Sequence, residues 1–180
     1  MNNPSLNSDD WLDVAIGTLK IEGHTGLRAL PLAKKLGVTR GSFYHHFESL
    51  EAFHVEVVAH WAKVSSGQVI RNAKDTLDPR QALDDLLQTT LLSGAELERA
   101  IRSWATVKDL VAVEVAKVDH ERIAVAHGLL IGCGVSDPVA ASRAKIIYWA
   151  AIGRLMMPYP EKSVLSETEI SDFARLMAFE

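Results

Sequence analysis

The chain has 180 residues and a single cysteine, Cys133, which excludes an internal disulfide framework and a cysteine-rich zinc site. A net charge of −4 argues against a surface that coats nucleic acid nonspecifically, yet it leaves room for one specific basic face. With 48% apolar residues the chain is expected to fold, and no uninterrupted apolar run approaches the ~18 residues of a membrane span. The N-terminus shows no export signal, so a cytoplasmic protein is expected.

The first predicted helix opens at Ser8, whose hydroxyl is suited to cap it, and its first turn carries Asp9 and Asp10 against the positive end of the helix dipole. Gly23 closes it, because glycine tolerates the left-handed conformation in which helices often end. Apolar residues at helical spacing form its buried stripe, and they are Leu12, Ala15, Ile16 and Leu19.

Residues 28–47 predict a helix-turn-helix. A first short helix has one apolar face, formed by Leu32, Ala33 and Leu36. Gly37 then stops this helix, and the hydroxyl of Thr39 is suited to cap the next one. Phe43 and Phe47, four residues apart, give the second helix a buried face.

The opposite face of the second helix is expected to contact DNA. Residues 23–47 include four Arg or Lys and no Asp or Glu, an imbalance that suits a phosphate surface. The N-terminal residues of such a helix meet base edges in the major groove, and here they are Arg40, Gly41 and Ser42. Residues expected to reach phosphates are Thr39, Tyr44 and His46. His45 is suited to either contact, or to solvent.

The motif resembles the signature of the TetR family of bacterial transcriptional regulators. The matching residues are Leu32, Ala33, Gly37, Val38, Thr39, Gly41, Phe43, Tyr44, His46 and Phe47. The resemblance implies a DNA-binding head at residues 1–50 and a body at residues 51–180 that binds a ligand and dimerises. It also implies a phosphate contact at Arg28, where the family usually has Ser or Thr.

Apolar spacing predicts further helices along the body, and no segment alternates with the period of a strand. The first of them is capped by Ser49, its apolar positions continue to Val64, and Ser65-Ser66-Gly67 loosen its end. Asp78-Pro79 opens the next helix, which is followed by a short helix at 97–104 and a long helix at about 107–133. Asp137-Pro138 opens another helix, and the last helix has the capping box Ser166 to Glu169. An all-α protein of about nine helices is therefore predicted.

Aromatic, apolar and polar side chains of the body are candidates for the walls of a small-molecule cavity. They are Trp104, His127, Tyr148, Trp149 and Met156. The same spacing equally suits ordinary core packing. The Cys133 thiol, beside two glycines, is more typical of a small buried residue than of a nucleophile.

A single short recognition helix makes few contacts, so a twofold homodimer on a palindromic, double-stranded operator is expected. The last two helices are the predicted interface, a four-helix bundle that the resemblance also implies. The interface residues are Ile147, Ala151, Ile152, Leu155, Ile170, Phe173 and Met177. Phe173 has an alternative role in the core of one subunit.

No metal, cofactor or catalytic activity is predicted. The histidine pairs lack a cysteine or carboxylate companion at a recognised spacing, and they are His45/His46, His54/His60 and His120/His127. Nucleophile-elbow, zinc-protease and phosphate-loop motifs are also missing from the sequence. The TetR resemblance implies a ligand-responsive repressor, in which an effector shifts the fourth helix and releases the operator. The alternative is a helical small-molecule-binding protein or enzyme without a DNA-binding role.

Overall fold

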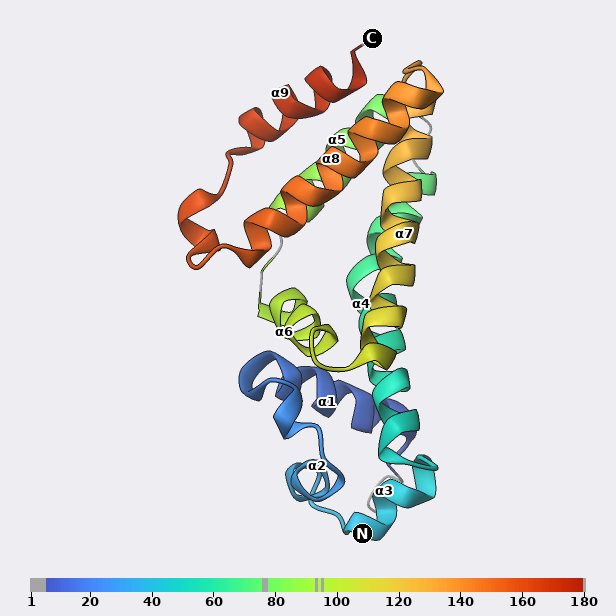
Figure 1. Cartoon of the computed structure of the whole chain (residues 1–180), viewed down its shortest axis with the longest axis vertical. Helices are drawn as coiled ribbons and strands as arrows, with labels where there is room; N and C mark the ends of the chain where they lie inside the picture. The colour runs from blue at the N-terminus through green and yellow to red at the C-terminus, as the bar shows by residue number, and fades with distance from the viewer. Residues whose placement is uncertain (1–5, 76–77, 93, 95, 180) are drawn as a thin grey trace. The chain divides into compact units, whose positions relative to one another are not determined.

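The computed structural model describes residues 6–75, 78–92, 94 and 96–179, except for the side chains of 65, 66, 68–75 and 160. The described residues form α-helices and two short 3-10 helices, and no strand occurs among them, which confirms the predicted fold class (Figure 1). The elements are α1 (Ser8–Glu22), η1 (His24–Gly26), α2 (Ala29–Lys35), α3 (Arg40–His46), α4 (Leu50–Asp75), α5 (Pro79–Leu92), α6 (Glu96–Ala105), α7 (Asp109–Gly132), α8 (Asp137–Met156), η2 (Pro160–Ser163) and α9 (Glu167–Ala178).

The chain divides into two compact units. The first unit contains Met1–Ala62 and Glu96–Ala116, and the second contains Lys63–Ala95 and Lys117–Glu180. The first unit therefore adds α6 and the start of α7 to the head helices. The functional boundary after residue 50 stays a prediction.

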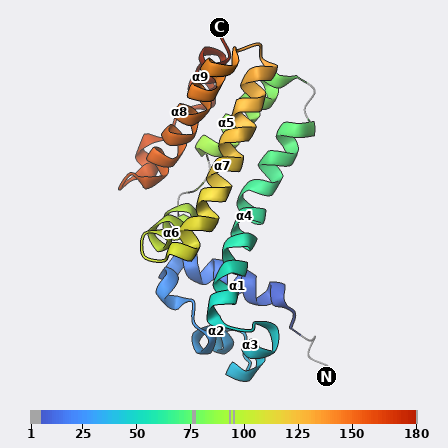
Figure 2. The same cartoon turned by 45° about the vertical axis from the view of Figure 1, so that its right-hand side comes forward.

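Aromatic rings fill the core of the first unit, where α1, α2 and α3 gather beside the first turns of α4 (Figure 2). The fully buried rings are those of Trp11, Phe43, Phe47, Phe53 and Trp61. Centroid distances of 4.8 Å from Phe47 to Phe53 and 5.4 Å from Trp11 to Phe43, both in edge contact, link rings from three helices. Edge contacts of this kind fix orientation as well as burying area.

A second aromatic cluster ties α6 to the head within the first unit. Trp104 of α6 is buried, its ring stacked on His24 at 6.2 Å and in edge contact with His54 at 4.8 Å. An ion pair from Lys108 Nζ to Glu51 Oε1, 3.0 Å long, joins the start of α7 to the start of α4.

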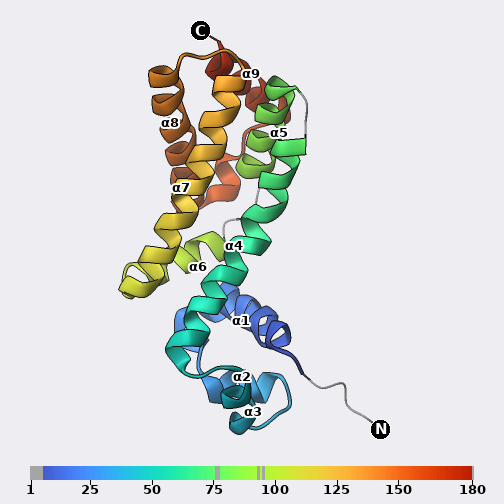
Figure 3. The ribbon, with the colours of Figure 1, turned by 90° about the vertical axis from the view of Figure 1, so that its right-hand side faces the viewer.

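The second unit has an aliphatic core between α5, α7, α8 and α9 (Figure 3). Its buried residues are Leu83, Leu87, Leu91, Ala126, Leu130, Val135, Ala140, Ala144, Ile147, Ala151, Ile170, Ala174 and Ala178. A Cβ on Gly132 would lie 2.9 Å from Pro79, so glycine permits the close approach of α7 to the start of α5. The Arg143 guanidinium holds the end of α9 by donating to the Met177 carbonyl at 2.7 Å and to the Phe179 carbonyl.

Several predicted helix boundaries are confirmed and three details are corrected. Asn7, not Ser8, caps α1, because the Asn7 side chain accepts from the N–H of Asp10 in a reciprocal capping box. The backbone of α4 stays helical through Ser65-Ser66-Gly67 to Asp75, so the predicted loosening is wrong. Val64 on the same helix is exposed, not buried. The caps by Ser49, Asp78 and Ser166 are confirmed.

Candidate nucleic-acid interface

The turn between α2 and α3 depends on Gly37. Its φ of 70° lies in the left-handed region, where a Cβ would be strained. The Gly37 N–H donates to the Lys34 carbonyl at 3.2 Å, and the Val38 N–H donates to the Ala33 carbonyl at 2.9 Å. Ala33 is fully buried, so a small side chain stands where the chain doubles back. The predicted helix-turn-helix is confirmed as a structure.

Thr39 immediately precedes α3, as predicted, but its hydroxyl makes no capping bond, and that detail of the prediction is wrong. The backbone satisfies the first turn instead, because the Ser42 N–H donates to the Thr39 carbonyl at 3.1 Å. The Thr39 side chain is therefore left on the surface. Its hydroxyl is suited to a partner outside the chain.

Phe43 anchors α3 on the head. Its ring is fully buried and lies 5.4 Å from Trp11, 5.1 Å from Phe47 and 5.0 Å from Phe53. Contacts with rings on α1 and α4 leave the helix little freedom to roll, because each ring meets its neighbours at a defined angle. The face opposite Phe43 is thus presented in one orientation.

The residues predicted to contact DNA all lie on the motif. Those with exposed side chains or backbone are Arg28, Thr39, Arg40, Gly41, Tyr44 and His45. Ser42 and His46 are half-buried, and the His46 ring lies 6.3 Å from Trp11, so His46 also contributes to the packing of the head. Arg28 is the N-cap residue of α2 but provides no side-chain cap there.

The basic residues of the motif do not all face outward. Lys35 Nζ donates to Thr18 Oγ1 at 2.8 Å and pairs with Glu22 Oε1 at 2.5 Å, so Lys35 ties α2 to α1. Lys34, its neighbour, is exposed and adds a cation that the sequence reasoning did not single out. The position of Lys34, three residues before Gly37 and beside the turn, could have indicated from the sequence that it is exposed.

Arg40 and Tyr44 form a pair on the exposed face of α3. Arg40 Nη2 donates to the Tyr44 hydroxyl at 3.2 Å, and the guanidinium carbon lies 5.4 Å from the centre of the Tyr44 ring. The two residues are four apart, so their side chains lie on one helix face. This contact was not foreseen from the sequence.

The predicted ligand-binding residues are divided between the two units. Trp104 belongs to the first unit, where it packs against histidines, and the other four belong to the second. Trp149 and Met156 are 64% and 46% exposed, because the buried stripe of α8 runs along another face, so neither can wall an enclosed cavity within one chain. Tyr148 donates to Asp119 Oδ1 at 2.5 Å, and a ligand role for Tyr148 or His127 stays a prediction.

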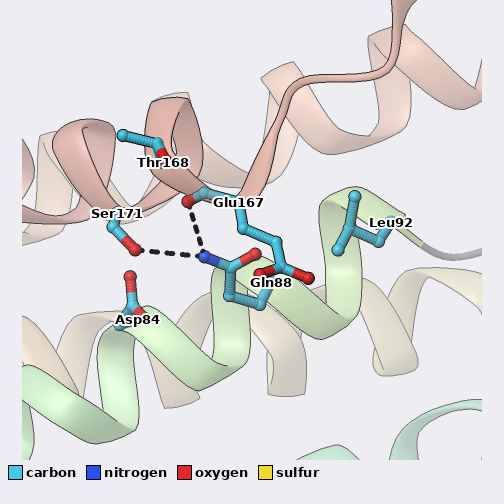
Figure 4. A pocket seen from close by; sticks show the side chains of 6 residues that line it. All are labelled: Asp84, Gln88, Leu92, Glu167, Thr168 and Ser171. Carbon is cyan, nitrogen blue, oxygen red and sulfur yellow. Dashed lines mark hydrogen bonds between the residues drawn. The ribbon is translucent and has the colours of Figure 1, made fainter.

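An open pocket lies between α5 and α9, with a volume of about 480 Å³ (Figure 4). Its lining consists of Asp84, Gln88, Leu92, Glu167, Thr168 and Ser171. Gln88 Nε2 donates to the Glu167 carbonyl at 2.9 Å and to Ser171 Oγ at 3.1 Å, which pins α9 to α5. The pocket contains none of the predicted ligand-binding residues.

The predicted dimer interface stays a prediction, and its residues differ in how far they are buried within one chain. Within one chain the side chains of four of its residues are buried, and these are Ile147, Ala151, Leu155 and Ile170. These four side chains therefore make most of their contacts within the chain. Phe173 and Met177 pack partly against the same core, and Ile152 is half-buried. Within the described helices, α8 exposes other apolar residues, namely Val139, Ile146, Trp149 and Met156.

The histidines considered for metal binding have other neighbours. His60 Nε2 lies 2.8 Å from Asp13 Oδ1, His54 Nε2 lies 3.2 Å from the Leu27 carbonyl, and His127 Nε2 lies 3.1 Å from Asp137 Oδ1. Among the described residues, no three His, Cys, Asp or Glu side chains gather as a metal site would require. Nor is any helix in the described part of the chain long and apolar enough to cross a membrane.

Solved structures identify the fold. No family model and no curated protein matches the chain. A TetR/AcrR family member aligns with a TM-score of 0.80 at 20% identity over 96% of this chain and 98% of its own. A TetR transcriptional regulator from Legionella pneumophila aligns with a TM-score of 0.76 at 17% identity over 98% of this chain and 97% of its own. The chain has the TetR fold.

A third structure with the TetR fold, AibR in complex with isovaleryl coenzyme A and operator DNA, aligns with a TM-score of 0.70 at 16% identity over 94% of this chain and 96% of its own. Identities this low establish the architecture and not the activity. The family resemblance drawn from residues 32–47 is confirmed at the level of the fold, over nearly the whole chain.

Proposed function

We propose that this chain is a transcriptional regulator in which residues 1–50 bind an operator and residues 51–180 bind a small-molecule effector and form a homodimer. The observation that carries the proposal is the exposed face of α3, where Arg40, Tyr44 and His45 are held outward by a helix fixed through Phe43. Basic residues beside it, Arg28 and Lys34, suit flanking phosphates.

Arg40 is the expected base-reading residue. Its guanidinium presents a pair of N–H donors that matches O6 and N7 of guanine, so Arg40→Ala should cost ~1–3 kcal/mol at the operator and relax the preference at one base pair per half-site. Lys34→Ala is the matched control, because loss of a phosphate contact weakens all duplexes alike.

The test is to select, from a pool of random duplex DNA, the sequences that the full chain binds, and then to measure affinities at matched salt. We expect a roughly palindromic site with equivalent half-sites about one helical turn, or a multiple of it, apart. If no sequence is enriched, the chain is instead a helical small-molecule-binding protein or an enzyme. A preference profile unchanged by Arg40→Ala would make Arg40 a phosphate contact.

We place the dimer on the outer face of α8. Ile146, Trp149 and Met156 are exposed at spacings of three and seven residues, and a Cβ on Gly153 between them would meet no atom within 4 Å, so a second copy could approach closely there. Trp149→Glu should give a folded monomer in sedimentation, because a charge in an apolar contact costs several kcal/mol. Phe173→Asp should instead destabilise the fold, because Phe173 packs against the core. A dimeric Trp149→Glu protein would rule out this face.

The proposed direction of control is repression. An effector bound among the body helices would change the position of α4 and hence of the head, lowering operator affinity. The AibR structure holds both a ligand and operator DNA, which supports a fold that accommodates both kinds of partner. Such a regulator would work in the cytoplasm.

A further inference from the structure

The Arg40–Tyr44 pair gives Tyr44 a role beyond a phosphate contact. Arg40 Nη2 already donates to the Tyr44 hydroxyl at 3.2 Å, and the guanidinium lies over the ring with its carbon 5.4 Å from the ring centre. Two independent contacts therefore define where the Arg40 head group lies, although both side chains are exposed.

Tyr44 is itself held in place. Its ring stands on edge against Phe43, with centroids 5.2 Å apart and an interplanar angle of 83°, and Phe43 is fully buried in the head. The buried Phe43 ring thus helps to fix the orientation of Tyr44, and Tyr44 in turn helps to fix the position of the Arg40 guanidinium. An arginine side chain without such contacts loses side-chain rotational freedom when it binds DNA, and this loss weakens binding. Arg40, held by Tyr44, has already lost part of that freedom in the free protein.

The contact leaves Arg40 able to read a base. A guanidinium has five N–H donors, and the bond to Tyr44 uses one of them. Whichever hydrogen of Nη2 is used, one complete edge with two parallel donors remains, which is what guanine O6 and N7 require. The Tyr44 hydroxyl, having accepted from Arg40, still has its own proton to donate.

We propose that Tyr44 is a positioning residue for Arg40: it holds the guanidinium in the orientation that reads guanine, and so helps to set the sequence preference of the head. This inference rests on the proposed function. It replaces the expectation that Tyr44 acts only as a phosphate contact, which would weaken every duplex equally when removed.

The experiment is a double-mutant cycle with Tyr44→Phe and Arg40→Ala in the full chain, on the selected operator and on an unrelated duplex at matched salt. Tyr44→Phe keeps the ring against Phe43 and removes only the hydroxyl, which accepts from Arg40. We expect it to weaken operator binding about threefold to tenfold, the loss of one hydrogen bond. Binding to the unrelated duplex should not change, the preference at the guanine should relax, and Tyr44→Phe should add nothing in the Arg40→Ala background.

Thr39→Ala is the control, since an exposed phosphate contact should weaken both duplexes alike and leave the preference intact. Equal weakening of both duplexes by Tyr44→Phe, or an effect that adds fully to that of Arg40→Ala, would overturn the inference while the proposed function stands. If the wild-type chain selects no operator, both fail.

A measurement without DNA tests the positioning role of Tyr44 separately from the proposed function. In the free protein, ¹⁵N relaxation of Arg40 Nε should show a more mobile side chain in Tyr44→Phe than in the wild type. Unchanged mobility would overturn the positioning role whatever happens on DNA.

Discussion

The cores of the two compact units are built from different kinds of side chain. In the first unit, rings such as Trp11, Phe43 and Phe53 meet at defined angles and fix α3 in one orientation. In the second unit, Leu, Ile and Ala side chains fill the core, with Ala140 and Ala144 allowing α8 to approach its neighbours closely. The packing of the first unit therefore depends on the angles between rings, and the packing of the second unit is less tied to particular angles.

Large aromatic residues also occupy opposite places in the two units. Trp11, Trp61 and Trp104 are buried in the first unit, whereas Trp149 and Tyr159 in the second are more than half exposed. An exposed tryptophan on a helix with other exposed apolar residues is typical of a surface that meets a partner. Buried rings thus stabilise the first unit, whereas these two rings of the second unit remain exposed.

The largest effect should come from removing a ring from the head. Phe43→Ala deletes a fully buried side chain that contacts four other rings, so we expect a loss of ~3–5 kcal/mol in the free energy of unfolding, measured with urea. Leu30→Ala is the control, because Leu30 lies in the same unit and is half exposed. Equal losses in the two variants would contradict the ring-based account of the head.

The core of the second unit should be sensitive to an added side chain. Ala144 is fully buried in the small-residue stripe of α8, so Ala144→Leu should overpack the core and cost ~1–3 kcal/mol of unfolding free energy. Lys145→Leu, at the neighbouring exposed position, controls for the change in helix propensity and hydrophobicity. A stabilised Ala144→Leu protein would show that space, and not close packing, surrounds this stripe.

The same contrast explains what could be predicted from the sequence. The head is specified locally: Gly37 with its positive φ, the Phe43 and Phe47 spacing and the polar outer face lie within a short stretch, so its structure and its candidate DNA residues could be located. The capping box of Ser166 and Glu169 was predictable for the same reason.

The body could be divided into helices, but the faces of α8 could not be assigned. Ile147 and Trp149 are both apolar and two residues apart, and only tertiary packing decides that Ile147 is buried and Trp149 exposed. The interface was therefore placed on the core face. The Arg40–Tyr44 bond escaped prediction because side-chain pairing four residues apart is permitted by the helix and not required by it.

The smallest effect concerns His54 in the aromatic cluster of the first unit. Its Nε2 bonds the Leu27 carbonyl at 3.2 Å, so the neutral ring carries its proton there, while Nδ1 is buried without a hydrogen-bond partner among the described residues. Burial lowers the pKa of His54 below its usual value. Burial is the largest influence, the hydrogen bond to the Leu27 carbonyl and the charge of Glu51 oppose it, and Lys108 and His24 lower the pKa of His54 further.

Because the folded chain binds this proton less readily than the unfolded chain, stability should be complete above the ordinary histidine pKa of about 6.5 and should fall as pH drops from there towards the lowered pKa of the folded state. We expect the urea midpoint of the wild type to decrease between about pH 7.5 and about pH 5.5 more steeply than that of His54→Gln, whose amide can still donate to Leu27 but does not titrate. Leu30→Ala, which changes no titratable group, should keep the wild-type slope. Parallel curves for the wild type and His54→Gln would show that this buried ring does not couple the head to pH.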